Sequence, residues 1–239
     1  MKILDFVIDK IVTGITVACV SCGAIFPISG NGDLVTSERA VSSFEYINIS
    51  GSAEVRFHVS EEYRAVVTVD SNLEEYTEVY TRDNVLNIES KNGNYFFSKY
   101  LVEVYCPALT GVSIAGSGQF SGSDAIIAST FDTNISGSGK MNGTIECNTF
   151  SAKISGSGEI TVMGNSKDSN ITIAGSGDFN GNELSVNDAV VRIAGSGKVN
   201  IWVTDNLKAD IAGSGDLNYR GNPKIDAHVN GSGRVYQEL

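Results

Sequence analysis

The sequence of 239 residues is poor in the side chains that build metal centres and nucleic-acid surfaces. It contains two histidines and four cysteines, and neither Cys106 nor Cys147 has a second thiol or histidine at the spacing of a zinc site. Lysine and arginine number 17 against 28 aspartates and glutamates, which gives a net charge of −11. Nucleic acids and anionic membrane surfaces are polyanions, so this charge argues against both as partners. We therefore predict no metal site, no cofactor and no nucleic-acid partner.

The sequence also lacks an apolar run long enough to cross a bilayer as a helix. Its most apolar stretch, residues 11–20, has instead the length of a signal-peptide core. A small residue precedes both Cys19 and Cys22, as at the cleavage site of bacterial lipoproteins. We predict a signal peptide with a lipoprotein-like cleavage site over residues 1–22 and a tether over residues 23–39. A frayed apolar N-terminus is the alternative.

The lipid would be attached to Cys19, with Cys22 as the second choice. The protein would then be exported, residing at the outer membrane, at the cell surface or in the periplasm, and would meet the membrane only through this anchor. In an oxidising compartment Cys106 and Cys147 could form a disulfide, and a pair of buried free thiols fits the sequence equally well.

What the sequence has in abundance is a repeat. Gly-Ser-Gly occurs seven times at intervals of 18 to 21 residues, with the first glycines at Gly116, Gly137, Gly156, Gly175, Gly195, Gly213 and Gly231. A fixed period near 20 residues is typical of a solenoid, in which each turn buries its apolar side against its neighbours. Apolar residues alternate with polar ones on both sides of each glycine pair, which predicts strands and argues against helix. The sequence therefore predicts an all-β solenoid with 18–21 residues per turn.

The glycines themselves indicate a bend in every turn. Only glycine adopts positive φ at low cost, and only glycine leaves room where the backbone of the next turn approaches closely. Residues 44–107 contain alternating strands with turn signals between them, typical of a longer-stranded or antiparallel cap. Within them, Gly51-Ser52 resembles a degenerate copy of the repeat, which we take as the first layer. Residues 40–239 would form a single domain.

No cap is evident at the other end of the predicted solenoid. A last turn that exposes its strand edge is a candidate contact for a homo-oligomer.

The chain resembles a bacterial family, the putative auto-transporter adhesin, head GIN domain. The resemblance is carried by the opening Phe44 to Ile49, by the segment from Pro107 into Ala115-Gly-Ser-Gly, and by the repeated Ile-x-Gly-Ser-Gly. It implies a right-handed parallel β-helix-like fold in exported, often lipid-anchored proteins. The family brings no catalytic or ligand residues with it.

Two columns of outward residues are the candidate sites. Asparagine repeats at one outward position, where it would form either a ladder of amides or a sugar-binding stripe near Trp202. These candidate ligand residues are Asn142, Asn180, Asn200, Asn218 and Trp202. A second column carries Glu159 beside Asp178, and lysines flank the pair. Two neighbouring carboxylates of this kind would be the acid and base of a carbohydrate-active enzyme.

We predict a non-enzymatic surface or periplasmic protein that binds or scaffolds extended ligands such as glycans or proteins. Paired carboxylates in a solvated column are more often an ordinary charge ladder than a catalytic pair, so no catalytic residue is assigned. The alternatives are a polysaccharide lyase or hydrolase built on the solenoid, and a purely structural envelope protein.

Overall fold

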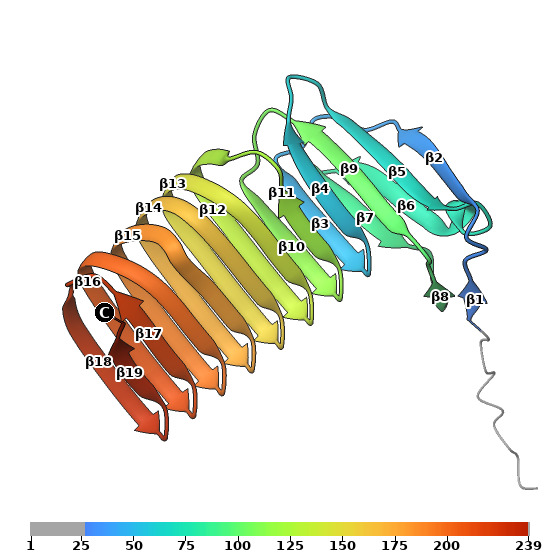
Figure 1. Cartoon of the computed structure of the whole chain (residues 1–239). Helices are drawn as coiled ribbons and strands as arrows, with labels where there is room; N and C mark the ends of the chain where they lie inside the picture. The colour runs from blue at the N-terminus through green and yellow to red at the C-terminus, as the bar shows by residue number, and fades with distance from the viewer. Residues whose placement is uncertain (1–26, 239) are drawn as a thin grey trace, which may run out of the picture.

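The structure, a computed structural model, describes residues 27–238. It is a parallel β-solenoid of about 7 turns joined to an N-terminal cap of longer and partly antiparallel strands (Figure 1). Four long strands each run from one Gly-Ser-Gly corner to the next, with irregularities in the pairing on the way, namely β13 (Lys140–Gly156), β14 (Glu159–Gly175), β15 (Asp178–Gly195) and β16 (Lys198–Gly213). The solenoid predicted from the repeat is confirmed.

The strands of the solenoid belong to one 17-stranded sheet that folds around the core, and each turn contributes to two parallel parts of it, called here the incoming sheet and the outgoing sheet. The segments that lead into a glycine corner stack as the incoming sheet, which contains β7 (Val85–Ser90), β3 (Tyr46–Gly51), β10 (Gly111–Gly116), β12 (Ile126–Gly137), the second halves of β13–β16, and β18 (Lys224–Gly231). The segments that leave a corner stack as the outgoing sheet, which contains β9 (Tyr100–Cys106), β4 (Glu54–Val59), β11 (Gln119–Gly122), the first halves of β13–β16, β17 (Asp216–Arg220) and β19 (Arg234–Gln237).

The corners stack glycine on glycine. The first glycine of each Gly-Ser-Gly has φ between +114° and +134°, and each is in register with its counterpart in the adjacent turn. A Cβ on Gly175 would lie 2.4 Å from the carbonyl oxygen of Gly156. That same oxygen accepts a hydrogen bond from the Ser176 N–H at 2.8 Å. Glycine is therefore required twice over, by the backbone angle and by the close approach of the next turn.

The core fills the space between the two sheets with stacked apolar side chains. The phenyl rings of Phe131, Phe150 and Phe179 follow one another at centroid distances of 6.4 and 6.1 Å. All three are fully buried, as are the isoleucines that precede the corners. Phe131 and Phe150 are in register on β12 and β13, whereas Phe179 lies in the first half of β15 and packs on Phe150 from the outgoing sheet.

The cap covers the N-terminal end of the solenoid with antiparallel strands. In continuation of the outgoing sheet, β5 (Arg64–Asp70) pairs antiparallel with β9, and β2 (Leu34–Arg39) pairs antiparallel with β5. In continuation of the incoming sheet, β6 (Thr77–Arg82) pairs antiparallel with β7. A 3₁₀ helix, η1 (Glu74–Tyr76), and the short pair β1 (Ile28–Ser29) and β8 (Tyr95–Phe96) complete it.

The degenerate repeat at Gly51 forms a true corner. Gly51 has φ +117° and lies in register with Gly116. Its prediction as the first layer is wrong, however, because β7 and β9 pair with the far edges of β3 and β4 and form one layer more. This layer has no Gly-Ser-Gly, and the chain reaches it only after passing through β5 and β6.

The prediction of a tether over residues 23–39 is wrong for residues 34–39. Residues 34–39 form β2, and the loop before them is held by the buried carboxylate of Asp70. That carboxylate accepts hydrogen bonds from the N–H groups of Gly32 and Ser98, both at 2.8 Å, and from the Ser98 hydroxyl. The polar composition of residues 34–39 suits a linker, and the pairing with β5 makes the segment a strand.

The remaining N-terminal predictions, including the signal peptide, Cys19 and Cys22, lie outside the described residues. Between residues 27 and 238, no helix has the length and hydrophobicity needed to cross a membrane. Cys106 and Cys147 are both free thiols in the structure. Burial raises the pKa of the Cys106 thiol to about 12, which makes it unreactive.

Candidate functional site

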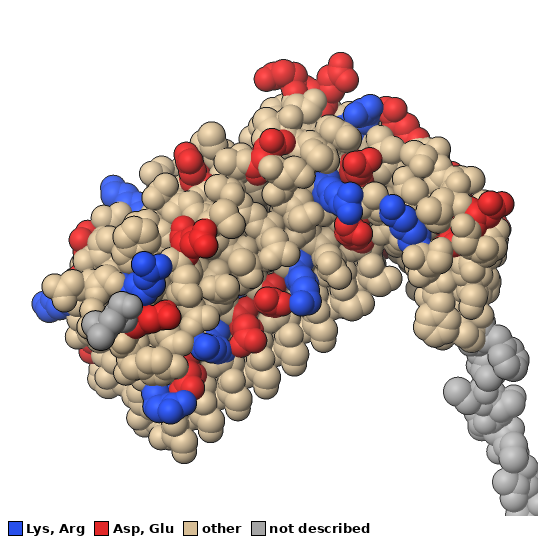
Figure 2. Space-filling model, in the orientation of Figure 1, with Lys and Arg blue, Asp and Glu red and all other residues tan. Residues whose placement is uncertain are grey.

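The outer face of the outgoing sheet carries both columns singled out in the sequence. One column, called here the charged column, lies next to the glycine corners and comprises Glu54, Gln119, Lys140, Glu159, Asp178, Lys198, Asp216 and Arg234. The other, the amide column, lies two residues further along each strand and comprises Arg56, Ser121, Asn142, Thr161, Asn180, Asn200, Asn218 and Tyr236. Figure 2 shows acidic and basic side chains following one another in a row along the turns.

The charged column is a ladder of charged side chains in which two ion pairs join neighbouring turns. Lys140 Nζ lies 2.7 Å from Glu159 Oε2, and this hydrogen bond raises the pKa of the lysine. Arg234 donates two hydrogen bonds to the Asp216 carboxylate, at 3.1 and 2.9 Å, and the pKa of that carboxyl is lowered by them. These groups are exposed to solvent, so their pairing fixes side-chain positions more than it adds stability.

The two carboxylates considered for catalysis are neighbours in this ladder. Glu159 and Asp178 occupy opposite positions on β14 and β15, as the repeat predicted. Glu159 is committed to Lys140 by the ion pair. No group of three or more histidine, cysteine or acidic side chains within residues 27–238 is arranged to hold a metal ion.

The amide column is partly a hydrogen-bonded ladder and partly free. Asn218 is only 7% exposed, and its Nδ2 donates to Asn200 Oδ1 at 2.8 Å. Asn142 and Asn180 are exposed to solvent. Next to Asn180 the face has a small hollow of about 150 Å³, lined by Thr161, Met163, Asn182 and Glu183 among others. The amide ladder thus accounts for Asn200 and Asn218, and sugar binding by the exposed asparagines stays a prediction.

Aromatic side chains stand beside the amides. Trp202 lies two residues after Asn200 on the same side of β16 and is 38% exposed. The Arg220 guanidinium lies 5.7 Å from the centre of its ring. Tyr236, 43% exposed, ends the amide column, with the Arg234 guanidinium 5.9 Å from its ring. The face therefore combines amides, which donate and accept hydrogen bonds, with flat aromatic surfaces.

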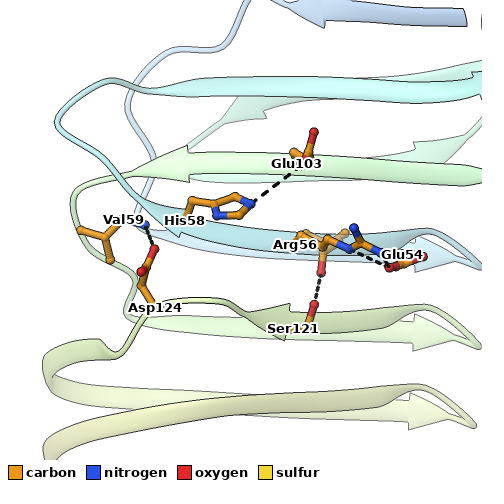
Figure 3. Close-up of polar contacts among 8 residues, drawn as sticks. Glu54, Arg56, His58, Val59, Glu103, Ser121 and Asp124 are labelled. Atoms are coloured by element: carbon orange, nitrogen blue, oxygen red, sulfur yellow. Dashed lines mark hydrogen bonds and ion pairs between the residues drawn. The ribbon is translucent and has the colours of Figure 1, made fainter.

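The same face continues onto the cap, which the repeat gave no means to predict. Arg56 donates to Glu54 at 2.6 and 2.9 Å (Figure 3). The His58 ring stacks on Tyr105 with centroids 4.9 Å apart. His58 Nε2 lies 3.9 Å from Glu103 Oε1. The only signal in the sequence is the alternation from Glu54 to His58, which assigns a side of the sheet without naming the neighbours on β9.

Comparison with known proteins agrees with this architecture. The family described as putative auto-transporter adhesin, head GIN domain, matches residues 43–223. The chain belongs to this family. No curated protein matches its sequence.

Solved structures from Parabacteroides distasonis and Bacteroides fragilis share the fold over most of their length. A putative adhesin from Parabacteroides distasonis is 26% identical with a TM-score of 0.74, covering 88% of this chain and 99% of its own. A putative lipid binding protein from the same organism is 27% identical with a TM-score of 0.75, covering 89% of this chain and 100% of its own. A putative adhesin from Bacteroides fragilis has a TM-score of 0.84 at 20% identity, covering 88% and 100%, and at that identity the likeness concerns the fold alone.

The GIN domain of this chain is thus adhesin-like in family and in fold. Its glycine corners are the structural part of the repeat, and its outgoing face carries the charged column and the amide column.

Proposed function

We propose that this GIN-domain protein is exported, carries a lipid at Cys19, and binds extended glycans along the outer face of the outgoing sheet without turning them over. The observation that supports the binding face most directly is Trp202, exposed beside Asn200 on a rigid sheet. Aromatic rings stack on the apolar faces of sugars, and amides bond to their hydroxyls. Successive strands lie about 4.8 Å apart, so an extended polymer meets the same groups repeatedly.

A glycan array tests the binding face. We expect the purified protein to bind one or more polysaccharides, and Trp202→Ala to weaken that binding at least about tenfold, as loss of a buried aromatic contact does. Asn142→Ala and Asn180→Ala should weaken it less. Two matched controls lie elsewhere: Ile127→Ala removes an apolar side chain that is 70% exposed, and Asn134→Ala removes an exposed asparagine from the incoming sheet. Equal losses in the controls and in Trp202→Ala would contradict the proposed face.

The same samples separate binding from catalysis. Incubation with each bound polysaccharide should release no reducing ends or unsaturated products. Turnover that disappears in Glu159→Gln or Asp178→Asn would instead identify a carbohydrate-active enzyme. Binding to proteins alone would assign a protein ligand, and a protein that binds neither would act as a structural part of the envelope.

The lipid anchor is tested by labelling in cells. We expect radiolabelled palmitate to be incorporated into the wild type and into Cys22→Ala, and to be lost in Cys19→Ala. Loss in Cys22→Ala alone would move the anchor to the second candidate. Equal labelling of all three proteins would exclude both cysteines.

A further inference from the structure

The C-terminal end of the solenoid presents a strand with one unpaired edge. β18 pairs with β16 on one side, and within residues 27–238 no strand lies along its other edge. Every residue of β18 is exposed. Figure 1 shows β18 and β19 in the last turn of the solenoid, at the end opposite the cap.

The inward side of β18 has the pattern of a core strand without its cover. Ile225, Ala227 and Val229 are in register with Leu207, Ala209 and Ile211 of β16. The three β16 residues are at most 2% exposed, whereas Ile225 and Val229 are each 40% exposed. One further strand placed on β18 would therefore bury an apolar row that is already aligned with the core.

The outward side of β18 is complementary to itself. When two copies of the strand run antiparallel about a two-fold axis through Ala227, residue 226 lies opposite residue 228 of the second copy. The Asp226 carboxylate then faces a His228 imidazole, which donates a hydrogen bond in either protonation state, and the contact occurs twice. In the same register Ile225 faces Val229, so the apolar row also closes on itself. Lys224 faces Asn230.

From this geometry we infer that two copies of the chain join end to end, with β18 pairing antiparallel to β18 across a two-fold axis. The pairing satisfies the exposed backbone edge of both copies and buries both apolar rows. It makes a closed dimer, because the same strand serves both subunits. A contact between this end and the cap of another copy would instead repeat without closing and produce filaments. The inference does not depend on the glycan-binding proposal.

Sedimentation velocity over a range of concentrations tests the dimer. The purified full chain is used with Cys19→Ala and Cys22→Ala, which removes both candidate lipid sites and prevents disulfides between them. We expect a species of twice the monomer mass that dissociates on dilution. A monomer at every concentration, or a series of filaments, would overturn the proposal.

Two charge variants test the register. Asp226→Lys places lysine opposite His228, and His228→Glu places glutamate opposite Asp226, so each alone should raise the dimer dissociation constant at least about tenfold. An equal mixture of the two should restore the dimer, because the lysine introduced into one copy then faces the glutamate introduced into the other.

A control substitution and a folding measurement accompany these variants. Asp168→Lys, the same change at an exposed position inside the stack, should leave the dimer unchanged. Circular dichroism verifies that each variant is folded. A dimer that both single variants leave intact, or that the mixture fails to restore, would show that β18 does not pair in this register.

Discussion

The solenoid and the cap solve the same problem, which is how to pair every buried backbone group, in different ways. In the solenoid a strand bonds to the strand about 20 residues away, and the register repeats from turn to turn. In the cap the partners come from unrelated segments, such as β2 with β5 and β5 with β9. In the solenoid the repeated spacing sets which strands pair. In the cap, single polar groups such as Asp70 hold segments in place that no repeat relates.

The largest effect is expected at the glycine corners. A methyl group on Gly175 would meet backbone of the adjacent turn, whereas one on Gly51, with nearly the same φ, would meet nothing within 4 Å. We predict that Gly175→Ala lowers the free energy of unfolding by about 4 kcal/mol or more, and Gly51→Ala by only about 1–2 kcal/mol from backbone strain. Chemical denaturation measures both. Equal losses would mean that the close approach between turns contributes nothing.

Next in size is the carboxylate that holds the cap together. Burial alone would raise the pKa of Asp70, but the hydrogen bonds from Ser98, Gly32 and Lys99 outweigh burial and hold the pKa below its usual value. Asp70→Asn should destabilise the cap by about 2–3 kcal/mol at pH 7, because it places an amide N–H₂ against N–H donors.

The sign of the pH effect follows from the lowered pKa. The stabilisation by Asp70 is present above the pKa of an unfolded aspartate, about 3.9, and is lost as the pH falls through the lower pKa of the folded state. The difference between wild type and Asp70→Asn should therefore shrink in acid. Hydrogen exchange at the amides of Gly32 and Ser98 locates the effect, and a difference independent of pH down to strong acid would contradict this role.

A smaller effect is expected in the amide column. Asn218→Ala removes a nearly buried hydrogen bond to Asn200 and should cost about 1 kcal/mol. Asn142→Ala, at an exposed position of the same column, should change stability by less than about 0.5 kcal/mol. Thermal melts of the two variants compare them, and a reversed order would show that the ladder does not contribute to the fold.

The smallest effect concerns the charged column. Lys140→Ala breaks the exposed pair with Glu159 and should lower the free energy of unfolding by less than Asn218→Ala does. The change should diminish further in high salt, which screens exposed pairs. A loss as large as that of Gly175→Ala would mean that the ion-pair ladder, and not the glycine corner, sets the register.

The outgoing face shows how far sequence reasoning reaches toward a site. The repeat placed Asn180 and Asn200 in one column because equivalent positions of a solenoid must stack. The repeat does not predict that Asn200 is hydrogen-bonded to Asn218 while Asn142 is exposed to solvent. That difference depends on how closely the adjacent turn packs at each position. It said nothing of the cluster of His58, Tyr105 and Glu103, because no period relates β4 to β9.

The sequence by itself determined the solenoid, its period, the inward and outward sides of its strands and the need for glycine at every corner. These properties depend on local sequence, and the same residue types at the same spacing occur in every copy of the motif. Only the tertiary structure decided that Leu34–Arg39 is a strand, that a layer without Gly-Ser-Gly lies beyond Gly51, and that Asp70 binds the loop at Gly32. Such contacts join segments far apart in the chain, where no repeated spacing records which strand will lie next to which.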